Sequence, residues 1–270
     1  MSETPFTVVD ADGVAHLQFA RPQAANSMTM AFWRAFPEAV RKLDRSGKIR
    51  ALVISGQGKH FCSGMDLSVF QSPELHAGNA SVDREAFVQT ILEFQRALSV
   101  VEEARFPVIA AVQGACIGAG LDLVAACDLR YAQADAYFRI EEINIGMMAD
   151  VGSLQRLPYK LPDAILREMA FTGATLTAAR AKECGFVNDL ADDAVAQALA
   201  AAAEIAQRAP LAVAGSKRAI NFARDHSVAE ALEQAALLQG GIWETGDILA
   251  AIQARKTKSA AKFADLKPRR

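Results

Sequence analysis

The chain has 270 residues and a formal net charge of −2, with 51% hydrophobic and 22% charged residues. This composition indicates an ordinary globular protein with one sizeable domain. The balanced charge gives no indication of a nucleic-acid or acidic-membrane partner. The N-terminus lacks the basic start and apolar run of a secretory signal, and no stretch reaches the roughly 18 to 20 apolar residues of a transmembrane helix.

The N-terminal part of the chain predicts strands and one helix. A hairpin is expected over residues 6–20, with Gly13 in its turn. Helical periodicity follows over residues 30–44, although Pro37 is unfavourable for its first turns. A continuous apolar run at residues 49–55 then predicts a buried strand.

The same order of elements occurs twice in the centre of the chain. The strand at 49–55 runs into the glycine-containing segment 56–67, and a helix is expected over 84–104. The strand at 108–112 runs into a second such segment, 113–120, which leads directly into the helical sequence LDLVAACD. This repetition predicts an α/β domain built from repeated units.

The two glycine-containing turns are weak motifs when each is taken alone. The sequence GAGLDL lacks the third glycine of a dinucleotide fingerprint, and GQGKHF lacks the spacing of a phosphate loop. Each could be an ordinary structural turn. As a pair after two central strands, they could instead place one backbone N–H each at an acyl carbonyl, which would make an oxyanion hole.

The C-terminal part is alanine-rich and helical in pattern. We predict a core over residues 1–195 and a helical oligomerisation region over residues 196–270. The apolar stripes of these helices must pack on the core or on another subunit, because such helices gain little alone. The last seven residues, ADLKPRR, are basic and are expected to be frayed.

Three acidic residues follow predicted elements in otherwise apolar sequence. Asp122 lies just inside the helix after Gly120, Glu142 follows the strand AYFRI, and Asp150 opens DVGSLQRL. Taken singly, Asp122 could compensate the charge of a helix N-terminus, and Asp150 could be a helix N-cap. Together they occupy positions where an α/β fold opens its active cleft.

The histidines and cysteines form no recognisable metal or nucleophile pattern. The histidines are scattered along the chain: His16, His60, His76 and His226. No CxxC pair occurs among the cysteines: Cys62, Cys116, Cys127 and Cys184. We therefore expect no metal site, and buried free thiols in a reducing cytoplasm. The absence of a GxSxG elbow disfavours a serine hydrolase.

Two segments carry a resemblance to a known family. The sequence GKHFCSGMDL, together with VQGACIGAGLDLVAACDLRYAQADAYFRIEEINIGMMADVGSLQRLP, resembles the enoyl-CoA hydratase/isomerase (crotonase) superfamily. The second segment looks most like the Δ3,5-Δ2,4-dienoyl-CoA isomerases. The resemblance implies a crotonase-type spiral of ββα units. It also implies C-terminal helices that help build trimers, which commonly pair into hexamers.

The resemblance also implies two oxyanion-hole donors. They would be the N–H groups of Met65, between Gly64 and Asp66, and of Ala119, between Gly118 and Gly120. Many members of the superfamily have glycine where this chain has Ala119. The N–H survives that change, although the added methyl could alter the shape of the pocket.

The three acids match positions that have different roles in the family. Asp122 and Glu142 match the two carboxylates of hydratases, and Asp150 matches a third acid of the dienoyl isomerases, where a typical hydratase has glycine. The match implies that Glu142 and Asp150 transfer the protons, and it leaves open which of them is the base and which the acid. Asp122 would have an electrostatic or orienting role. An apolar pocket would raise their pKa values toward neutrality.

Two other functions remain open at this point. A 2-enoyl-CoA hydratase would use Asp122 and Glu142, with Asp150 reduced to a helix cap. A non-catalytic RNA-binding or scaffolding relative would require a basic patch, which the charge balance disfavours.

The partner implied by the resemblance is coenzyme A, carried on the substrate and not held as a cofactor. Lys59, at the edge of the first turn, is the preferred contact for its phosphates. The other candidates are Arg21, Arg255, Lys256 and Lys262. A cytoplasmic setting is expected.

Overall fold

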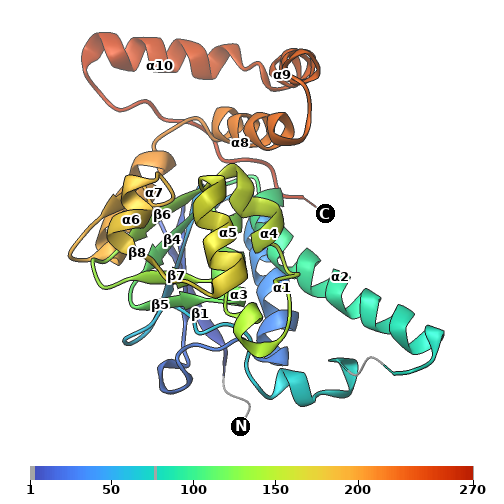
Figure 1. The fold of residues 1–270 in the computed structure, drawn as a ribbon. Helices are drawn as coiled ribbons and strands as arrows, with labels where there is room; N and C mark the ends of the chain where they lie inside the picture. The colour runs from blue at the N-terminus through green and yellow to red at the C-terminus, as the bar shows by residue number, and fades with distance from the viewer. Residues whose placement is uncertain (1–3, 76–77, 270) are drawn as a thin grey trace.

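A computed structural model describes residues 4–75 and 78–269 of the chain, and Figure 1 shows its fold. Within this part the main sheet has the strand order β1-β2-β3-β4-β6-β9. Its strands are β1 (Phe6–Ala11), β2 (Val14–Phe19), β3 (Ala51–Gly56), β4 (Val108–Val112), β6 (Leu129–Ala132) and β9 (Asp189–Leu190). The β1–β2 pair is antiparallel and the remaining neighbours are parallel.

A smaller sheet with the order β5-β7-β8 lies beside the main one. Its strands are β5 (Ala115–Ile117), β7 (Tyr137–Arg139) and β8 (Leu176–Thr177). The helices are α1 (Met30–Ser46), α2 (Ser81–Glu103), α3 (Ala119–Ala126), α4 (Ser153–Arg156), α5 (Asp163–Thr172), α6 (Ala178–Glu183), α7 (Ala194–Ala206), α8 (Pro210–Asp225), α9 (Val228–Ile242) and α10 (Thr245–Thr257). Short 3₁₀ helices are η1 (Pro22–Ala24), η2 (Val69–Gln71), η3 (Pro73–Leu75), η4 (Glu142–Ile145) and η5 (Leu157–Tyr159).

Both faces of the main sheet are covered, which explains the unbroken apolar sequence of its central strands. Every residue of β3 and β4 is buried, as expected for parallel strands between two layers. One face packs against a large apolar core that includes residues of α1, α2 and α3. The other face packs against three alanines of α7, which lie on the alternate residues of β3 and β4. The predicted α/β class is therefore confirmed.

The helix α1 continues through Pro37. Thr29 caps its N-terminus by accepting a hydrogen bond from Phe32 N at 3.4 Å. Proline removes one backbone donor inside a helix. The burial of Phe32, Trp33 and Phe36 in the aromatic part of the core offsets this loss.

The C-terminal helices α8, α9 and α10 stand above the sheet layers in Figure 1. Lys217 of α8 is buried, and its ammonium group contacts Asp128 at 2.8 Å and donates to the carbonyls of Val101 and Phe106. The preceding helix α7 packs on the sheet itself. The division predicted at residue 195 stays a prediction.

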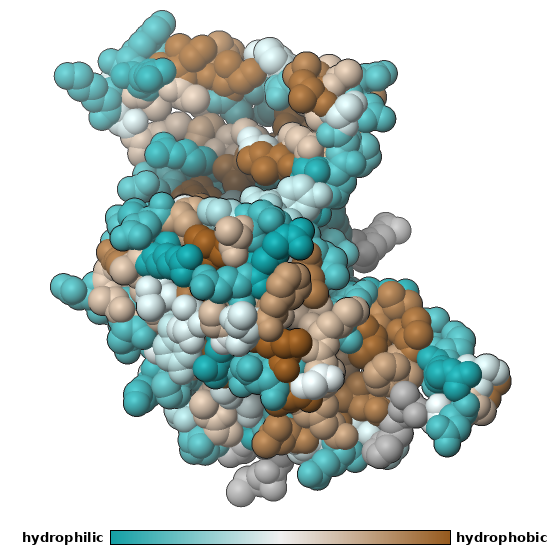
Figure 2. Space-filling model, viewed as in Figure 1, coloured by the Kyte–Doolittle hydropathy of each residue, from teal (hydrophilic) through white to brown (hydrophobic). Residues whose placement is uncertain are grey.

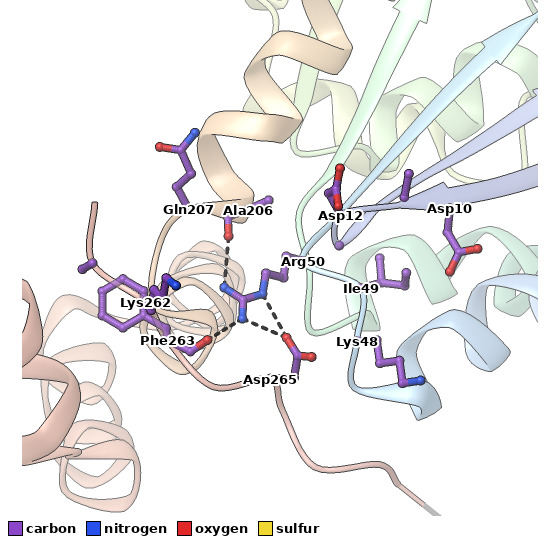
Figure 3. A pocket seen from close by; sticks show the side chains of 13 residues that line it. Asp10, Asp12, Lys48, Ile49, Arg50, Ala206, Gln207, Lys262, Phe263 and Asp265 are labelled. Atoms are coloured by element: carbon purple, nitrogen blue, oxygen red, sulfur yellow. Dashed lines mark hydrogen bonds and ion pairs between the residues drawn. The ribbon is translucent and has the colours of Figure 1, made fainter. Parts of the chain in front are cut away.

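The chain after α10 returns to the core, so the expectation of a frayed terminus is wrong for residues up to 269. Figure 3 shows the Arg50 guanidinium donating to Asp265 at 2.8 Å and to the carbonyls of Phe263 and Ala206. Arg269 N also donates to Arg45 O at 2.9 Å. Specific ion pairing, which composition does not reveal, holds this segment in place.

Candidate active site

The two glycine-containing turns meet at the carboxyl ends of β3 and β4. Cys62 of the first turn forms a parallel bridge with Cys116, adjacent to the second turn. A Cβ built on Gly64 would lie 3.5 Å from Ala119 N. The backbones that carry the two predicted donors are therefore in contact.

The Met65 N–H is not used by the strand bridge that fixes its neighbours. Met28 N donates to Gly64 O at 2.8 Å, and Asp66 N donates to Met28 O at 3.0 Å. Successive backbone groups of an extended chain point in opposite directions. The Met65 N–H therefore lies on the side away from Met28.

The Ala119 N–H is the first of helix α3 and has no acceptor within that helix. Further along the helix, Leu121 N and Asp122 N both donate to Gly118 O, at 2.8 and 3.0 Å. Together with the Met65 N–H, this arrangement can supply two donors to one developing oxyanion.

Asp66 holds the first turn in position. It accepts hydrogen bonds from Ser68 Oγ at 2.6 Å, Ser27 Oγ at 2.7 Å and Arg21 Nη1 at 3.0 Å. Partial burial acts to raise the pKa of Asp66, but these bonds hold it well below its ordinary value. Arg21 is therefore part of the turn's scaffold, and its role as a contact for the phosphates of coenzyme A stays a prediction.

Gly118 and Glu142 lie against each other at the second turn. Gly118 has φ 53° and ψ −128°, a conformation that favours glycine. A Cβ at this residue would lie 3.3 Å from Glu142 Oε1. The Glu142 carboxyl, at the start of η4, is thereby placed next to the Ala119 donor.

Asp122 is completely buried in the first turn of α3. Its Oδ1 accepts a hydrogen bond from Ser153 N at 2.5 Å, while its Oδ2 has no hydrogen-bond partner within the described residues. Burial raises the pKa of Asp122 to about 6, although the hydrogen bond from Ser153 and the charge of Arg156 oppose the rise. A buried carboxylate with an unpaired oxygen is costly, and protonation relieves that cost.

The pKa values of the other two acids are also raised. Burial, followed by the charge of Asp122, raises the pKa of Glu142 to about 7, and the Asp150 charge adds to the rise. Burial likewise raises the pKa of Asp150. The sequence predicted such a rise in the pKa of these carboxyls. The Asp122 and Glu142 carboxyls can therefore exchange protons near neutral pH.

Asp150 does not cap a helix, so the N-cap interpretation is wrong. Helix α4 begins at Ser153, its N-cap residue is Gly152, and no side chain caps it. The Asp150 backbone is held instead by Gln95 of α2, whose Nε2 donates to Asp150 O at 2.7 Å. The Asp150 carboxyl is left available to the site.

Sequence reasoning missed Ser153 and Arg156. Ser153 acts through its backbone N–H, which no residue type reveals. Arg156 is a single arginine in an apolar stretch, and only its partners Glu102 and Ser99 show why it is there.

The candidate phosphate contacts do not converge on one described site. Lys59 is exposed next to the first turn, and Arg255 and Lys256 are exposed on α10. Lys262 lines a hollow of about 860 Å³ beside Arg50, and none of the three acids lines that hollow (Figure 3). A role for any of these cations in binding coenzyme A stays a prediction.

The remaining sequence expectations concern thiols, histidines and membranes. Cys62, Cys116 and Cys127 are buried free thiols, as predicted, and Cys184 is partly exposed. His76 lies outside the described residues. Within residues 4–75 and 78–269, no group of three or more His, Cys, Asp or Glu side chains could hold a metal ion. No helix of that same part is long and apolar enough to cross a membrane.

Comparisons with known proteins identify the class. The sequence pattern described as enoyl-CoA hydratase/isomerase matches residues 10–266. An enoyl-CoA hydratase from Polaromonas sp. JS666 superimposes with a TM-score of 0.86 at 27% identity, covering 96% of this chain and 99% of its own. Another from Mycobacterium tuberculosis H37Rv has a TM-score of 0.84 at 30% identity, with 97% and 99% coverage. The chain belongs to the enoyl-CoA hydratase/isomerase family and has the crotonase fold.

Within this family the chain is similar to isomerases. It is 39% identical to a mitochondrial Δ3,5-Δ2,4-dienoyl-CoA isomerase of Rattus norvegicus, over 92% of this chain and 78% of the relative. It is 35% identical to a peroxisomal Δ3,5-Δ2,4-dienoyl-CoA isomerase of Arabidopsis thaliana, over 94% and 93% of the two chains. The protein is an enzyme of this family.

Proposed function

We propose that this enzyme converts 3,5-dienoyl-CoA thioesters into 2,4-dienoyl-CoA thioesters. The observation that carries the proposal is the third acid. Asp150 is a partly buried carboxyl whose charge acts on both Asp122 and Glu142, and it is not engaged as a helix cap. The identity to dienoyl-CoA isomerases supports the same conclusion.

The reaction needs one proton removed and one proton added, with no net change in atoms. A carboxylate takes the proton from the carbon beside the thioester, and the electron pair moves into the carbonyl to give an enolate conjugated with both double bonds (a trienolate). The N–H groups of Met65 and Ala119 stabilise that oxyanion by several kcal/mol. A second, protonated carboxyl then donates a proton to the far end of the diene, which completes the shift.

The three acids divide these tasks. Glu142 and Asp150 are the proton-transfer groups. The pKa of Glu142 is raised to about 7, which allows both of its protonation states near neutrality, and burial also raises the pKa of Asp150 above its ordinary value. Asp122 is held by a hydrogen bond from Ser153 N, and its negative charge raises the pKa of Glu142. A dianionic arrangement is disfavoured, since like charges in a buried site raise each other's pKa.

The test is a direct assay with 3,5-octadienoyl-CoA, followed by the absorbance of the conjugated 2,4-dienoyl thioester. Asp150→Asn should lower kcat by about 10³-fold or more, because one of two proton-transfer groups is lost. Hydration of a 2-enoyl-CoA is measured in parallel with both proteins. Brisk hydration that survives Asp150→Asn, with no diene conversion, would instead make the enzyme a hydratase that uses Asp122 and Glu142.

We also propose that the enzyme works as a trimer or hexamer. Large apolar side chains of α9 and α10 are more than half exposed: Leu232, Leu237 and Leu249. Brown, apolar surface is visible over these helices in Figure 2. Such surface on a single chain marks an interaction site. Light scattering during size-exclusion chromatography tests this, and a monomer at micromolar concentration would contradict it.

We also propose a cytoplasmic setting for the enzyme.

A further inference from the structure

Arg156 contacts both helix α2 and the segment that follows Asp150. Its guanidinium donates to Glu102 Oε2 at 2.8 Å and to Ser99 Oγ at 3.0 Å, both on α2. It also approaches Val151 O at 3.4 Å, in the segment that follows Asp150. With only 11% of its side chain exposed, Arg156 is a fixed cation and not a solvated surface charge.

The loop that carries Asp150 is shaped around this arginine. Gly152 has φ 144°, and a Cβ there would lie 1.8 Å from Arg156 Nη1. The next residue, Ser153, donates its backbone N–H to Asp122. Arg156 thus fills the space beneath Gly152, with Asp150 on one side of that residue and the Asp122 hydrogen bond on the other.

Glu102 fixes the arginine from the opposite side and joins it to the C-terminal helices. Its other oxygen accepts from Arg224 Nη1 of α8 at 2.6 Å, and its carbonyl accepts from Asn221 Nδ2 at 3.3 Å. The two oxygens of one carboxylate therefore link α4, at the site, to α8.

We propose that Arg156 is a positioning residue for the acid cluster, and that Glu102 is the partner that fixes its place and moderates its charge. Arg156 holds residues 150–153 and supplies the positive charge that faces Asp122. The predicted effect of Arg156 on the isomerase reaction rests on the proposed function. The predicted effect of Arg156 on the protonation of the carboxyls does not.

The charges that act on Asp122 come from several elements. Glu142 belongs to η4, Asp150 to the loop before α4, and Arg156 to α4. The buried thiol of Cys116 on β5 also faces the carboxyl. The charge of Arg156 favours the ionised form of Asp122, and the charge of Asp150 opposes it.

The inference predicts that only one member of the Arg156–Glu102 ion pair raises the carboxyl titration when it is neutralised. Arg156→Gln removes the cation, so the carboxyl titration of the cluster should move upward by about one pH unit. Glu102→Gln leaves the cation less neutralised, so the titration should move down or remain in place. Arg156→Lys retains the charge and should remain close to the wild-type titration. A loss of packing alone would shift both Gln variants in the same direction.

The titration is followed by infrared spectroscopy of the protonated carboxyl band, with Asp122→Asn used to assign the Asp122 component. The matched control is Arg105→Gln, because the Arg105–Asp44 pair is similarly buried but the arginine contacts none of the three acids. The control should leave the band unchanged. If Arg156→Gln also leaves it unchanged, or if both Gln variants raise it, the inference is overturned.

The effect on turnover is measured separately with the 3,5-dienoyl substrate. Arg156→Gln should lower kcat about tenfold at pH 7 and displace its pH profile upward, while Arg156→Lys should restore the profile. A wild-type enzyme without diene conversion would refute the proposed function, yet the infrared result would still decide this inference. If Arg156→Gln does not fold, the other two variants decide it. A wild-type titration in Arg156→Lys, with no upward shift in Glu102→Gln, supports the inference, and an upward shift in either variant overturns it.

Discussion

Two buried ionic groups of the same chain are arranged in opposite ways. In the middle of α8, Lys217 has a carboxylate and two carbonyl acceptors within 2.9 Å. At the site, three acids act on one another, and Asp122 keeps an unpaired oxygen within the described structure. The first group joins parts of the fold. The second is electrostatically unfavourable, and such an arrangement is retained where protonation states must change.

The largest expected effect on stability comes from breaking the satisfied group. Lys217→Met leaves Asp128 without its cation and should lower the free energy of unfolding by about 3 to 5 kcal/mol. Urea unfolding at pH 7 measures it. The control is Arg167→Met, which breaks an exposed pair with Asp163 and should cost less than about 1 kcal/mol. Equal losses in the two variants would show that Lys217 is not specially placed.

The next effect is a gain from relieving the unfavourable group. Asp122 has a folded pKa of about 6 against an ordinary 3.8, so folding favours its protonated form. Its stabilising contribution is present below about pH 4 and is lost as pH rises through 6. Asp122→Asn should therefore be more stable than the wild type at pH 8, by of order 3 kcal/mol, and no more stable at pH 4.

This prediction is measured as the difference between the two unfolding curves across pH 4 to 8. The difference isolates Asp122 from carboxyls such as Asp66, whose pKa is lowered and whose effect on stability has the opposite sign. If the difference in unfolding free energy does not change with pH, folding does not raise the pKa of Asp122.

A smaller effect concerns the backbone that brings the donors and acids together. Gly118→Ala should cost about 1 to 3 kcal/mol, because its φ and ψ disfavour a side chain. It should also lower kcat, since the added methyl meets Glu142 Oε1. Gly146→Ala is the control: Gly146 has φ 80°, and no atom of the described residues lies within 4 Å of an added Cβ. If the two variants lose the same activity, the Gly118–Glu142 contact has no catalytic consequence.

Local sequence predicted the elements and singled out the three acids, while the resemblance predicted the roles of those acids. The hairpin with Gly13 and the strands β3 and β4 follow from turn chemistry and apolar runs, which short segments encode. Asp122, Glu142 and Asp150 could be singled out because carboxyls in apolar sequence are unusual. That these carboxyls influence one another's pKa could be expected only by assuming that all three lie in the same cleft.

Sequence was least informative where distant segments meet. The role of Arg156 depends on Glu102 and Ser99, which lie 54 and 57 residues away. The bound terminus depends on Arg50, 215 residues from Asp265. Asp150 was open to interpretation as an N-cap because Asp before a helix is usually one. The start of α4 at Ser153, after a glycine with positive φ, excluded that interpretation.

The central claim is that two different carboxyls carry the two proton transfers, and exchange in D₂O tests it most directly. Glu142→Gln and Asp150→Asn are each incubated with 3,5-octadienoyl-CoA in D₂O, and the substrate is examined by NMR. The account predicts that both variants lose conversion, while only one still exchanges the proton beside the thioester. That variant lacks the acid at the far end of the diene. Equal exchange in both variants, or conversion that persists in either one, would contradict the account.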